Sequence, residues 1–394
     1  MPGPLDGVRV IDLSTMISGP LATMLLGDQG ADVIKVEAPG SGDLVRRLGT
    51  NKRGMSPTFA TVNRNKRSIV LNLREKRGRE LLEKLVATAD VFVQNFRPGT
   101  TDRMGIGEVD LRKIRPDLIY VSISGFGESG PYAGKRVYDP LIQALSGLAT
   151  IQADRDSGRP QMVRLIIPDK LTAMTAAQAI TAALFVRQRT GKGEHVRLSM
   201  LDAMVSFLWP EGMAGYTWVG DESERSRPQL AQDLVFETTD GFMTAGTVSD
   251  AEWEAFARSV DHPEWLEDER FSTPAGRVTY VTERLDLMAR ALRGRTTAEW
   301  MDRFDAIGVP CAPILDRAGL LHHPQIAANQ LIVESDHPHA GRMRQTRPAA
   351  RFDENPAEIR LPAPLHGEHT DEILGEAGIS SAERARLRDA GVIG

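Results

Sequence analysis

Residues 164–202 read RLIIPDKLTAMTAAQAITAALFVRQRTGKGEHVRLSMLD, and the interpretation of the whole chain starts from this stretch. Pro168 disfavours helical geometry in the residue before it, so a helix is predicted to begin at Asp169. Residues 170–187 are rich in Ala and carry charge only at their two ends. A helix that is apolar on nearly all faces is predicted to be buried, and the glycines that follow are predicted to close it. The sequence therefore places one carboxylate at the mouth of a buried helix.

Asp169 has two interpretations. Aspartate is among the preferred N-cap residues, and most such residues only accept hydrogen bonds from free backbone N–H groups. The alternative is a catalytic carboxylate that the helix holds still. The local pattern alone favours the cap, so a catalytic role needs support from residues elsewhere in the chain.

Composition restricts the class of protein. The chain has 394 residues, of which 41% are hydrophobic and 26% charged, as is typical of a soluble globular protein with room for two domains. A net charge of −5 argues against a nucleic-acid partner. The single cysteine, Cys311, excludes an intrachain disulfide and fits a reducing compartment. Residues 1–10 lack the pattern of a secretory signal and no run is apolar enough to span a membrane, so a cytoplasmic location is expected.

Alternating β and α patterns fill the first half of the chain. Strands are predicted at 8–13, 33–37, 68–72, 91–94, 118–123 and 194–199, with helices at 20–27 and 78–88 between them. This order predicts an α/β fold with a Rossmann-like parallel-sheet large domain. The turn after the first strand reads STMISGP, without the glycine spacing of a dinucleotide-binding loop, and no phosphate-binding P-loop motif occurs. A dehydrogenase or a P-loop ATPase is therefore disfavoured.

Domain boundaries follow from shifts in composition. Residues 1–220 are expected to form the N-terminal part of the large domain, and the polar segment 221–233 a linker. Residues 234–325 are expected to form a smaller α+β domain, with strands at 234–238 and 242–246 and helices at 252–259 and 297–306. Residues 326–394 are expected to be a long return connection and the C-terminal part of the large domain, ending in a helical tail at 370–390.

Basic residues concentrate where strands end, which is where open α/β sheets bind ligands. A phosphate-bearing ligand is one interpretation, and a solvated surface is the simpler one for any single residue. The segment QNFRPG at 94–99 places an amide, an aromatic ring and a guanidinium together, although Phe96 could instead belong to the core. The histidines have no metal-binding spacing, and no nucleophile-elbow motif occurs. A nucleophile for acyl transfer would therefore have to be a carboxylate.

Five blocks of the sequence, at 8–37, 94–106, 136–148, 164–193 and 364–374, resemble the family III (CaiB/BaiF) CoA-transferases. The blocks include VRVIDLSTMISGP, QNFRPGTTDRMGI, RVYDPLIQALSGL and PLHGEHTDEIL, and the resemblance covers nearly the whole chain. It implies that Asp169 is the catalytic residue. It also implies CoA-binding positions at Ile17, Ser18, Leu71, Asn72, Leu73, Arg74, Asn95, Phe96, Arg97, Arg103, Arg136, Val137, Tyr138 and Asp139.

The implied activity is transfer of CoA from an acyl-CoA to an acceptor carboxylic acid through a covalent aspartyl intermediate on Asp169. The CoA thioester is then a substrate, and no permanently bound cofactor, metal, nucleic acid or membrane is expected. One alternative is a 2-methylacyl-CoA racemase or epimerase, but racemases of the family use a histidine where this chain has Tyr138. A second alternative is a non-catalytic acyl-CoA-binding relative, which the presence of Asp169 disfavours.

Differences from formyl-CoA transferase affect the expected acceptor acid. That branch carries a glutamine where this chain has Ile17, and a glycine-rich loop where this chain reads SRPQLAQD at 226–233. Both differences argue against oxalate as the acceptor, and they leave the donor and acceptor acids open. The resemblance further implies a homodimer of interlocked chains, with an active site that draws residues from both.

Overall fold

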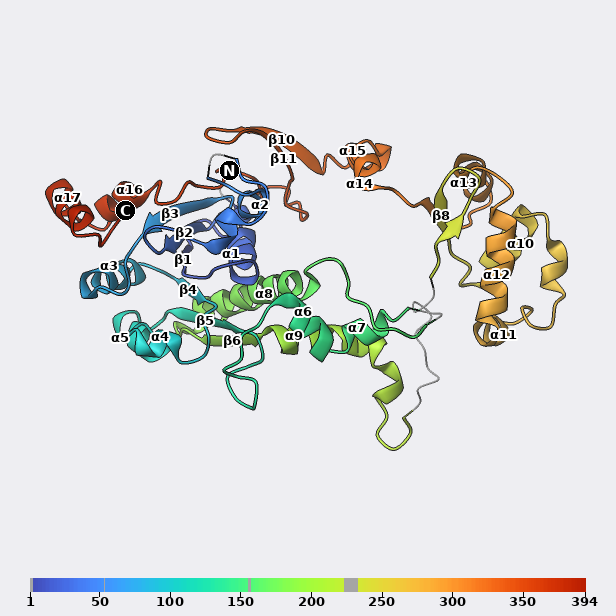
Figure 1. The fold of residues 1–394 in the computed structure, drawn as a ribbon, viewed down its shortest axis with the longest axis horizontal. Helices are drawn as coiled ribbons and strands as arrows, with labels where there is room; N and C mark the ends of the chain where they lie inside the picture. Colours follow the sequence, from blue (N-terminus) through green and yellow to red (C-terminus); the bar gives the residue numbers. More distant parts are fainter. Residues whose placement is uncertain (1–2, 53, 155–156, 223–232) are drawn as a thin grey trace. The chain divides into compact units, whose positions relative to one another are not determined.

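The computed structural model describes residues 3–52, 54–154, 157–222 and 233–394 (Figure 1). The chain forms two compact units, one made of Met1–Met213 with Leu331–Gly394 and the other of Ala214–Gln330. It therefore leaves the first unit once and returns to it once. The predicted linker at 221–233 lies almost entirely outside the described residues.

A six-stranded parallel sheet forms the centre of the first unit, in the order β3-β2-β1-β4-β5-β6. Its strands are β1 (Arg9–Asp12), β2 (Asp32–Glu37), β3 (Lys66–Val70), β4 (Val91–Gln94), β5 (Ile119–Ser124) and β6 (His195–Ser199). The predicted α/β class is thus confirmed. The strand order reverses between β1 and β4, and open α/β sheets of this order bind ligands in the crevice at that point.

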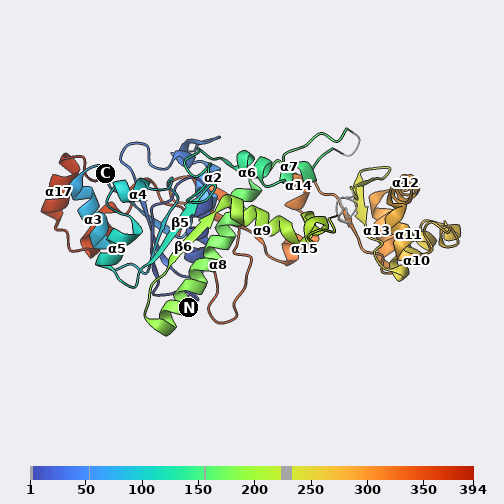
Figure 2. The ribbon, with the colours of Figure 1, turned by 90° about the horizontal axis from the view of Figure 1, so that it is seen from below.

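Helices cover both faces of this sheet (Figure 2). On one face α1 (Ser18–Asp28) and α8 (Ile167–Thr190) pack against the valine and isoleucine side chains of the inner strands. On the other face lie α3 (Lys76–Val86), α5 (Glu108–Ile114), α16 (Thr370–Glu376) and α17 (Ser381–Asp389). The last two helices come from the C-terminal segment, so the two ends of the chain build one core.

Helix α8 differs from its prediction at its start and in its burial. It begins at Ile167, two residues early, because a proline is tolerated in the first turn, where its missing N–H is not needed. It ends at Thr190, and the Gly191 that follows has left-handed geometry and donates to the Arg187 carbonyl over 2.8 Å. Only one face is buried in this chain, whereas the Met174 and Phe185 side chains are 63% and 59% exposed. The prediction of burial on nearly all faces is therefore wrong for the single chain.

The return connection contains two strands that were not predicted. Strands β10 (Ile332–His337) and β11 (Gly341–Thr346) form an antiparallel hairpin. Glu334 on β10 pairs with Arg342 and Arg344 on β11, at 2.7 and 2.5 Å. Cross-strand ion pairs stabilise this hairpin. Its strands lack the apolar alternation from which strands are predicted.

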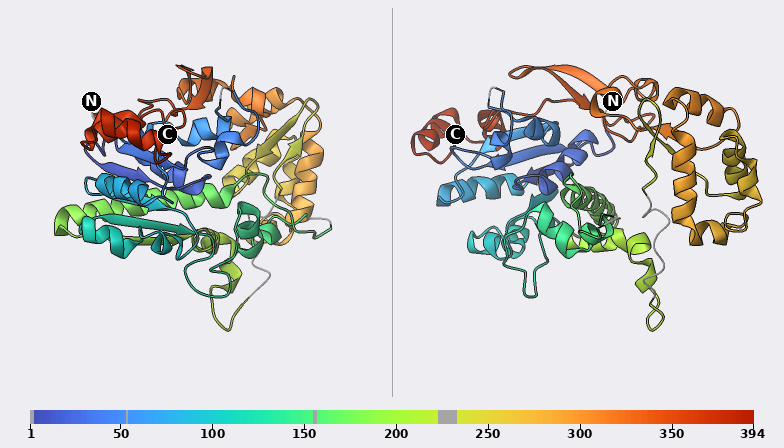
Figure 3. Two further views of the ribbon diagram at one scale, coloured as in Figure 1. Left: turned by 60° about the vertical axis from the view of Figure 1, so that its left-hand side comes forward. Right: turned by 45° about the vertical axis from the view of Figure 1, so that its right-hand side comes forward.

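The second unit, seen in Figure 3, has a small antiparallel sheet of β7 (Phe236–Glu237), β8 (Phe242–Ala245) and β9 (Cys311–Pro313). Its core is aromatic and includes Trp253, Phe256, Trp300 and Phe304. The predicted helices correspond to α10 (Asp250–Ser259) and α13 (Thr297–Asp305), whereas α11 (Pro274–Thr279), α12 (Val281–Leu292) and β9 were not predicted. Burial raises the pKa of the Cys311 thiol to about 11, so this cysteine is a poor nucleophile.

The remaining elements are short, apart from α9. They are α2 (Pro57–Val62), α4 (Thr100–Arg103), α6 (Asp139–Leu145), α7 (Leu148–Ile151), α9 (Met200–Gly212), α14 (Arg317–Leu320), α15 (Pro324–Ala328) and the 3-10 helices η1 (Leu44–Arg47), η2 (Ala214–Tyr216) and η4 (Pro263–Leu266).

Candidate active site

The loops that follow β1 and β4 meet at the point where the strand order reverses. The side-chain amide of Asn95, just after β4, accepts a hydrogen bond from the Thr15 N–H at 2.9 Å and donates one to the Thr15 carbonyl at 2.7 Å. This two-way contact fixes the β1 loop against the β4 loop. The sheet thus brings two predicted site segments, 17–18 and 95–97, to one place.

Asp169 links two helix N-termini. It is the third residue of α8, and hydrogen bonding from the side chain and the backbone N–H of Ser18, the first residue of α1, favours the charged form of its carboxylate. The residue before α1, Ile17, offers no side-chain cap. Asp169 therefore interacts with one of the free donors of α1, the Ser18 N–H, whereas Ile166 occupies the N-cap position of α8. The prediction that Asp169 begins its own helix is wrong, and the helix that it caps is the neighbouring one.

A second carboxylate, that of Asp139, binds the backbone of Asp169. Asp139, the first residue of α6 and only 3% exposed, accepts the Asp169 backbone N–H at 3.2 Å and the Gln143 side-chain amide at 2.7 Å. Gln143 also accepts the Val163 N–H at 2.9 Å. Asp139 and Gln143 therefore fix the segment that leads into α8, so the predicted CoA-binding residue Asp139 has a structural contact with the catalytic candidate.

Burial raises the pKa of both carboxylates, and the charge of Asp139 adds to the shift of Asp169. Burial, and then the charge of Asp139, raise the pKa of Asp169 to about 6, while the two hydrogen bonds from Ser18 act in the opposite direction. Burial also raises the pKa of Asp139, against the hydrogen bond from Gln143. Asp169 is thus more basic than an ordinary aspartate yet mostly ionised at neutral pH. Such a perturbed carboxylate beside a crevice is a candidate nucleophile or base.

A cavity of about 230 Å³ opens between the predicted segments. Its walls include Asn95, Phe96 and Arg97 on one side, and Arg136, Val137 and Tyr138 on the other. Both walls adjoin segments that contact Asp169. Asn95 binds the loop that ends at Ser18, and Tyr138 directly precedes Asp139. Six of the predicted residues therefore line one cavity, and residues next to its two walls contact the candidate nucleophile.

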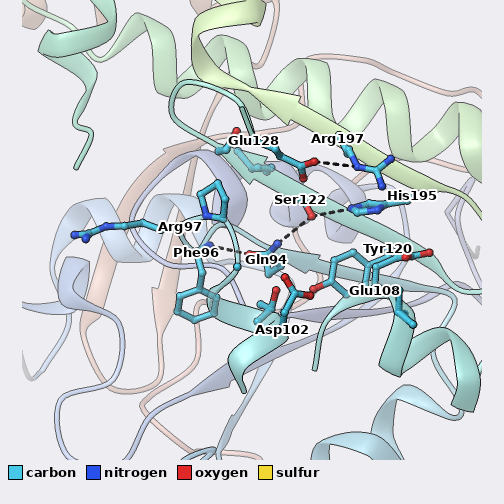
Figure 4. A pocket seen from close by; sticks show the side chains of 16 residues that line it. Gln94, Phe96, Arg97, Asp102, Glu108, Tyr120, Ser122, Glu128, His195 and Arg197 are labelled. Atoms are coloured by element: carbon cyan, nitrogen blue, oxygen red, sulfur yellow. Dashed lines mark hydrogen bonds and ion pairs between the residues drawn. The ribbon is translucent and has the colours of Figure 1, made fainter. Parts of the chain in front are cut away.

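An adjoining cavity of about 370 Å³ lies over β4, β5 and β6 (Figure 4). Within it a chain of hydrogen bonds runs from the Phe96 N–H to Gln94 at 2.8 Å, from Gln94 to Ser122 at 3.0 Å, and between Ser122 and His195 at 2.9 Å. This chain fixes the turn that carries Phe96 and Arg97. Burial and the nearby Arg197 lower the pKa of His195, so its ring is neutral at neutral pH.

Sequence reasoning did not single out Gln94, Ser122 and His195 as neighbours. A signal was present, because each is a polar residue on a strand of otherwise apolar sequence, and residues at alternate positions share one face of a sheet. The register between strands, which aligns them, could not be read from one sequence.

Other predicted residues lie away from these cavities. Leu71 is buried in the core, and Asn72 donates its backbone N–H to the Val392 carbonyl at 2.8 Å, so Leu71 and Asn72 contact the C-terminal segment beside β3, and Leu73 and Arg74 follow them. Arg103, in α4, donates to the Thr100 hydroxyl at 3.1 Å. In the described part of the chain neither Leu71 to Arg74 nor Arg103 lines either cavity.

Three of the basic residues that lie near strand ends are structural. Arg46, Arg64 and Lys66 are buried and pair with Glu37, Asp28 and Asp12 at 2.7, 2.7 and 2.8 Å. Both interpretations offered for the basic residues, a phosphate contact and a solvated surface, are therefore wrong for these three. Within the described ranges no group of three or more His, Cys, Asp or Glu side chains could hold a metal ion. None of the helices described there is long and apolar enough to cross a membrane.

Comparison with known proteins identifies close relatives. The model of CoA-transferase family III matches residues 5–370. The succinyl-CoA:glutarate CoA-transferase of Mus musculus is 35% identical over 95% of this chain and 86% of its own length. The formyl-CoA:oxalate CoA-transferase of Afipia carboxidovorans is 32% identical over 99% of this chain and 97% of its own. The crystal structure of a CaiB/BaiF family protein from Brucella suis superposes with a TM-score of 0.83 at 31% identity, covering 96% of this chain and all of that one.

The pair of carboxylates generates a prediction that does not depend on turnover. Replacing Asp139 with Asn removes a negative charge beside Asp169, so the pKa of Asp169 should fall below about 6. Titration of ¹³C-labelled aspartate carboxyls by NMR measures it, with the Asp169→Asn variant assigning the signal. The Asp110→Asn variant on α5, at a half-buried position, is the control and should cause no shift. An unchanged or raised pKa in Asp139→Asn would contradict the described electrostatics.

Proposed function

The chain belongs to CoA-transferase family III, and from this premise we propose that it moves CoA from an acyl-CoA to an acceptor carboxylic acid through a covalent intermediate on Asp169. One observation carries the proposal: the Asp169 carboxylate has a pKa raised to about 6, and Asp169 contacts Ser18 and Asp139, which belong to the segments that adjoin the two walls of the 230 Å³ cavity. The cavity would hold the CoA part of the thioester, and Asp169 would meet its acyl carbon.

The walls of this cavity suit CoA. Arg97, Lys135 and Arg136 are exposed cations that can meet phosphate groups, and Phe96 offers an apolar surface to the pantetheine arm. The Asn95 side chain is engaged with Thr15, so its role is to shape the cavity. We further propose, from the family resemblance, that Leu71 to Arg74 and Arg103 contact the nucleotide end of CoA.

In the first half-reaction an ionised Asp169 oxygen attacks the thioester carbonyl, and the carbon–sulfur bond breaks. This gives an acyl-aspartyl anhydride and the CoA thiolate. The thiolate then attacks the Asp169 side-chain carbonyl, releases the donor acid and leaves an aspartyl-CoA thioester. No step takes up or releases a proton, so the only protonation requirement is an ionised Asp169.

The second half-reaction reverses these steps with another acid. The acceptor carboxylate attacks the aspartyl carbonyl and expels the thiolate, which then attacks the acceptor's carbonyl to give the new acyl-CoA. Negative charge develops on the Asp169 carbonyl oxygen in both halves. The Ser18 N–H at the start of α1 is already directed at this carboxylate, so it can stabilise that charge.

The rival reaction, racemisation of a 2-methylacyl-CoA, needs a second base on the opposite face of the substrate. The carboxylate closest to Asp169 is Asp139, which is engaged by the Asp169 N–H and by Gln143. Tyr138, at the position of the racemase histidine, is 61% exposed. Incubation with an acyl-CoA in deuterated buffer separates the reactions, because deuterium at the alpha carbon without an acceptor acid would support racemisation.

We also propose that the active protein is a homodimer of interlocked chains, with a site that draws residues from both. Large apolar side chains of α8 and α9 are exposed in the single chain, among them Phe185 and Phe207 at 59% each. The chain also crosses twice between its two units, as threading through a partner requires. A second copy would cover these apolar side chains.

Replacing Asp169 with Ala should abolish transfer and leave CoA binding intact, because the nucleophile is lost and the cavity is not. The loss of the α1 cap should cost about 1 kcal/mol of unfolding free energy. In the wild type, hydroxylamine added during turnover should convert Asp169 to a hydroxamate, detected by peptide mass. The Asp110→Ala control should transfer normally, and near-normal transfer by Asp169→Ala would refute the mechanism.

Arg97→Ala and Arg136→Ala should each raise the KM for the acyl-CoA and reduce its dependence on salt, because each removes one cation that meets phosphate. The value of kcat should change less. Arg103→Ala, outside the cavity, should give a smaller rise, and Arg189→Ala at the exposed end of α8 none. A fall in kcat with unchanged KM for both cavity variants would place these residues at the acyl group instead.

The dimer should persist on dilution, because interlocked chains separate only after partial unfolding. Sedimentation of labelled protein at nanomolar concentration should give twice the 43.2 kDa of one chain. An active species with the mass of one chain would overturn this prediction.

A further inference from the structure

The loop that delivers Ser18 to Asp169 has an unusual backbone. Residues 13–17 connect β1 to α1, and within them Met16 has φ of 68°. A residue with a side chain rarely occupies this left-handed region, and such strain persists only where the surroundings impose it. Met16 lies two residues before Ser18, so its conformation sets the direction in which α1 begins.

A buried ion pair holds this loop. The Asp43 carboxylate accepts the Met16 N–H at 3.1 Å and pairs with the Lys35 ammonium at 2.9 Å. The same ammonium donates to the Ser14 carbonyl at 3.0 Å. Both charged side chains are 0% exposed. One pair of opposite charges therefore binds the loop backbone at two positions, Ser14 and Met16.

Asp43 is itself held on both sides. Its backbone N–H donates to Glu37 at 2.9 Å, and its carboxylate caps η1 by accepting the Val45 N–H at 3.1 Å. The far side of the loop is closed by Gly19, where an added Cβ would overlap the Ser14 side chain. The loop thus has little room to adopt another path.

We propose that Asp43 is a positioning residue for CoA transfer: its carboxylate, paired with Lys35, keeps Met16 left-handed and so directs the Ser18 N–H and hydroxyl at Asp169. This inference rests on the proposed function for its link to catalysis. Without the constraint Met16 returns to negative φ, and Ser18 turns away from Asp169. The carboxylate then loses two donors that favour its charged form and the developing oxyanion.

Two substitutions at Met16 test the conformation without removing a charge. Met16→Val should mimic the loss of Asp43, because a β-branched residue is strongly disfavoured at positive φ. Met16→Gly is its matched partner, because glycine adopts positive φ freely, and it should retain more activity than Met16→Val. Asp43→Ala should act like Met16→Val, and adding Met16→Gly to it should restore part of kcat. Asp28→Ala, which breaks the buried pair with Arg64 at the other end of α1, controls for lost stability and should leave kcat unchanged.

The readouts separate positioning from folding. In Met16→Val and Asp43→Ala, kcat should fall about 10- to 100-fold with little change in the KM for acyl-CoA. The acid limb of kcat should move to higher pH, because the lost hydrogen bonds favoured ionised Asp169, while Asp139 still faces it from α6. Equal activity of Met16→Val and Met16→Gly, or an unmoved acid limb in both damaged variants, would overturn the proposal.

NMR titration of the Asp169 carboxyl tests the positioning of Ser18 without turnover. A raised pKa in Met16→Val and a pKa close to that of the wild type in Met16→Gly would support the positioning of Ser18 even if the wild type transfers no CoA. The NMR titration tests the positioning role of Asp43 and Met16, whereas CoA transfer by the wild type tests the proposed function. Failure of one is therefore distinguishable from failure of the other.

Discussion

The hydrogen bonds between the Asp169 carboxylate and Ser18 are the interaction on which the site depends. They join the N-termini of α8 and α1, two helices that cover the same face of the sheet. A carboxylate in this place caps a helix, is stabilised by its dipole, and remains partly exposed. Its structural role and its chemical role therefore use the same atoms, and the local sequence pattern could not distinguish them.

The parallel sheet explains why distant segments converge on Asp169. Parallel strands end at one edge, and the reversal of order between β1 and β4 leaves a crevice there. The β1 loop supplies Ser18, the β4 loop supplies the wall at Asn95 to Arg97, and the segment after β5 supplies Tyr138 and Asp139. In this account the buried charges around Lys35 fix the first of these loops, whereas the Gln94, Ser122 and His195 chain fixes the second.

Much of the first unit could be predicted, because most of its strands contain short runs of valine and isoleucine that alternate along the chain with helical patterns. The hairpin at 332–346 could not, since its strands are stabilised by Glu334 and its arginine partners. The family resemblance identified Asp169 and the cavity residues, but not Asp43, which lies in a polar loop with no pattern of its own. The structure adds what one sequence lacks, namely which charges are buried together and which helix a carboxylate caps.

The fate of oxygen in a single turnover tests the central claim most directly. Enzyme in excess is mixed with an acyl-CoA and an acceptor acid labelled with ¹⁸O in its carboxylate. The aspartyl route leaves one ¹⁸O atom on Asp169 and releases the donor acid unlabelled, because the donor acid departs with an oxygen from the enzyme. Mass analysis of the peptide containing Asp169 should show this gain. An unlabelled Asp169 together with ¹⁸O in the donor acid would mean that the two acids react directly, and would contradict the account.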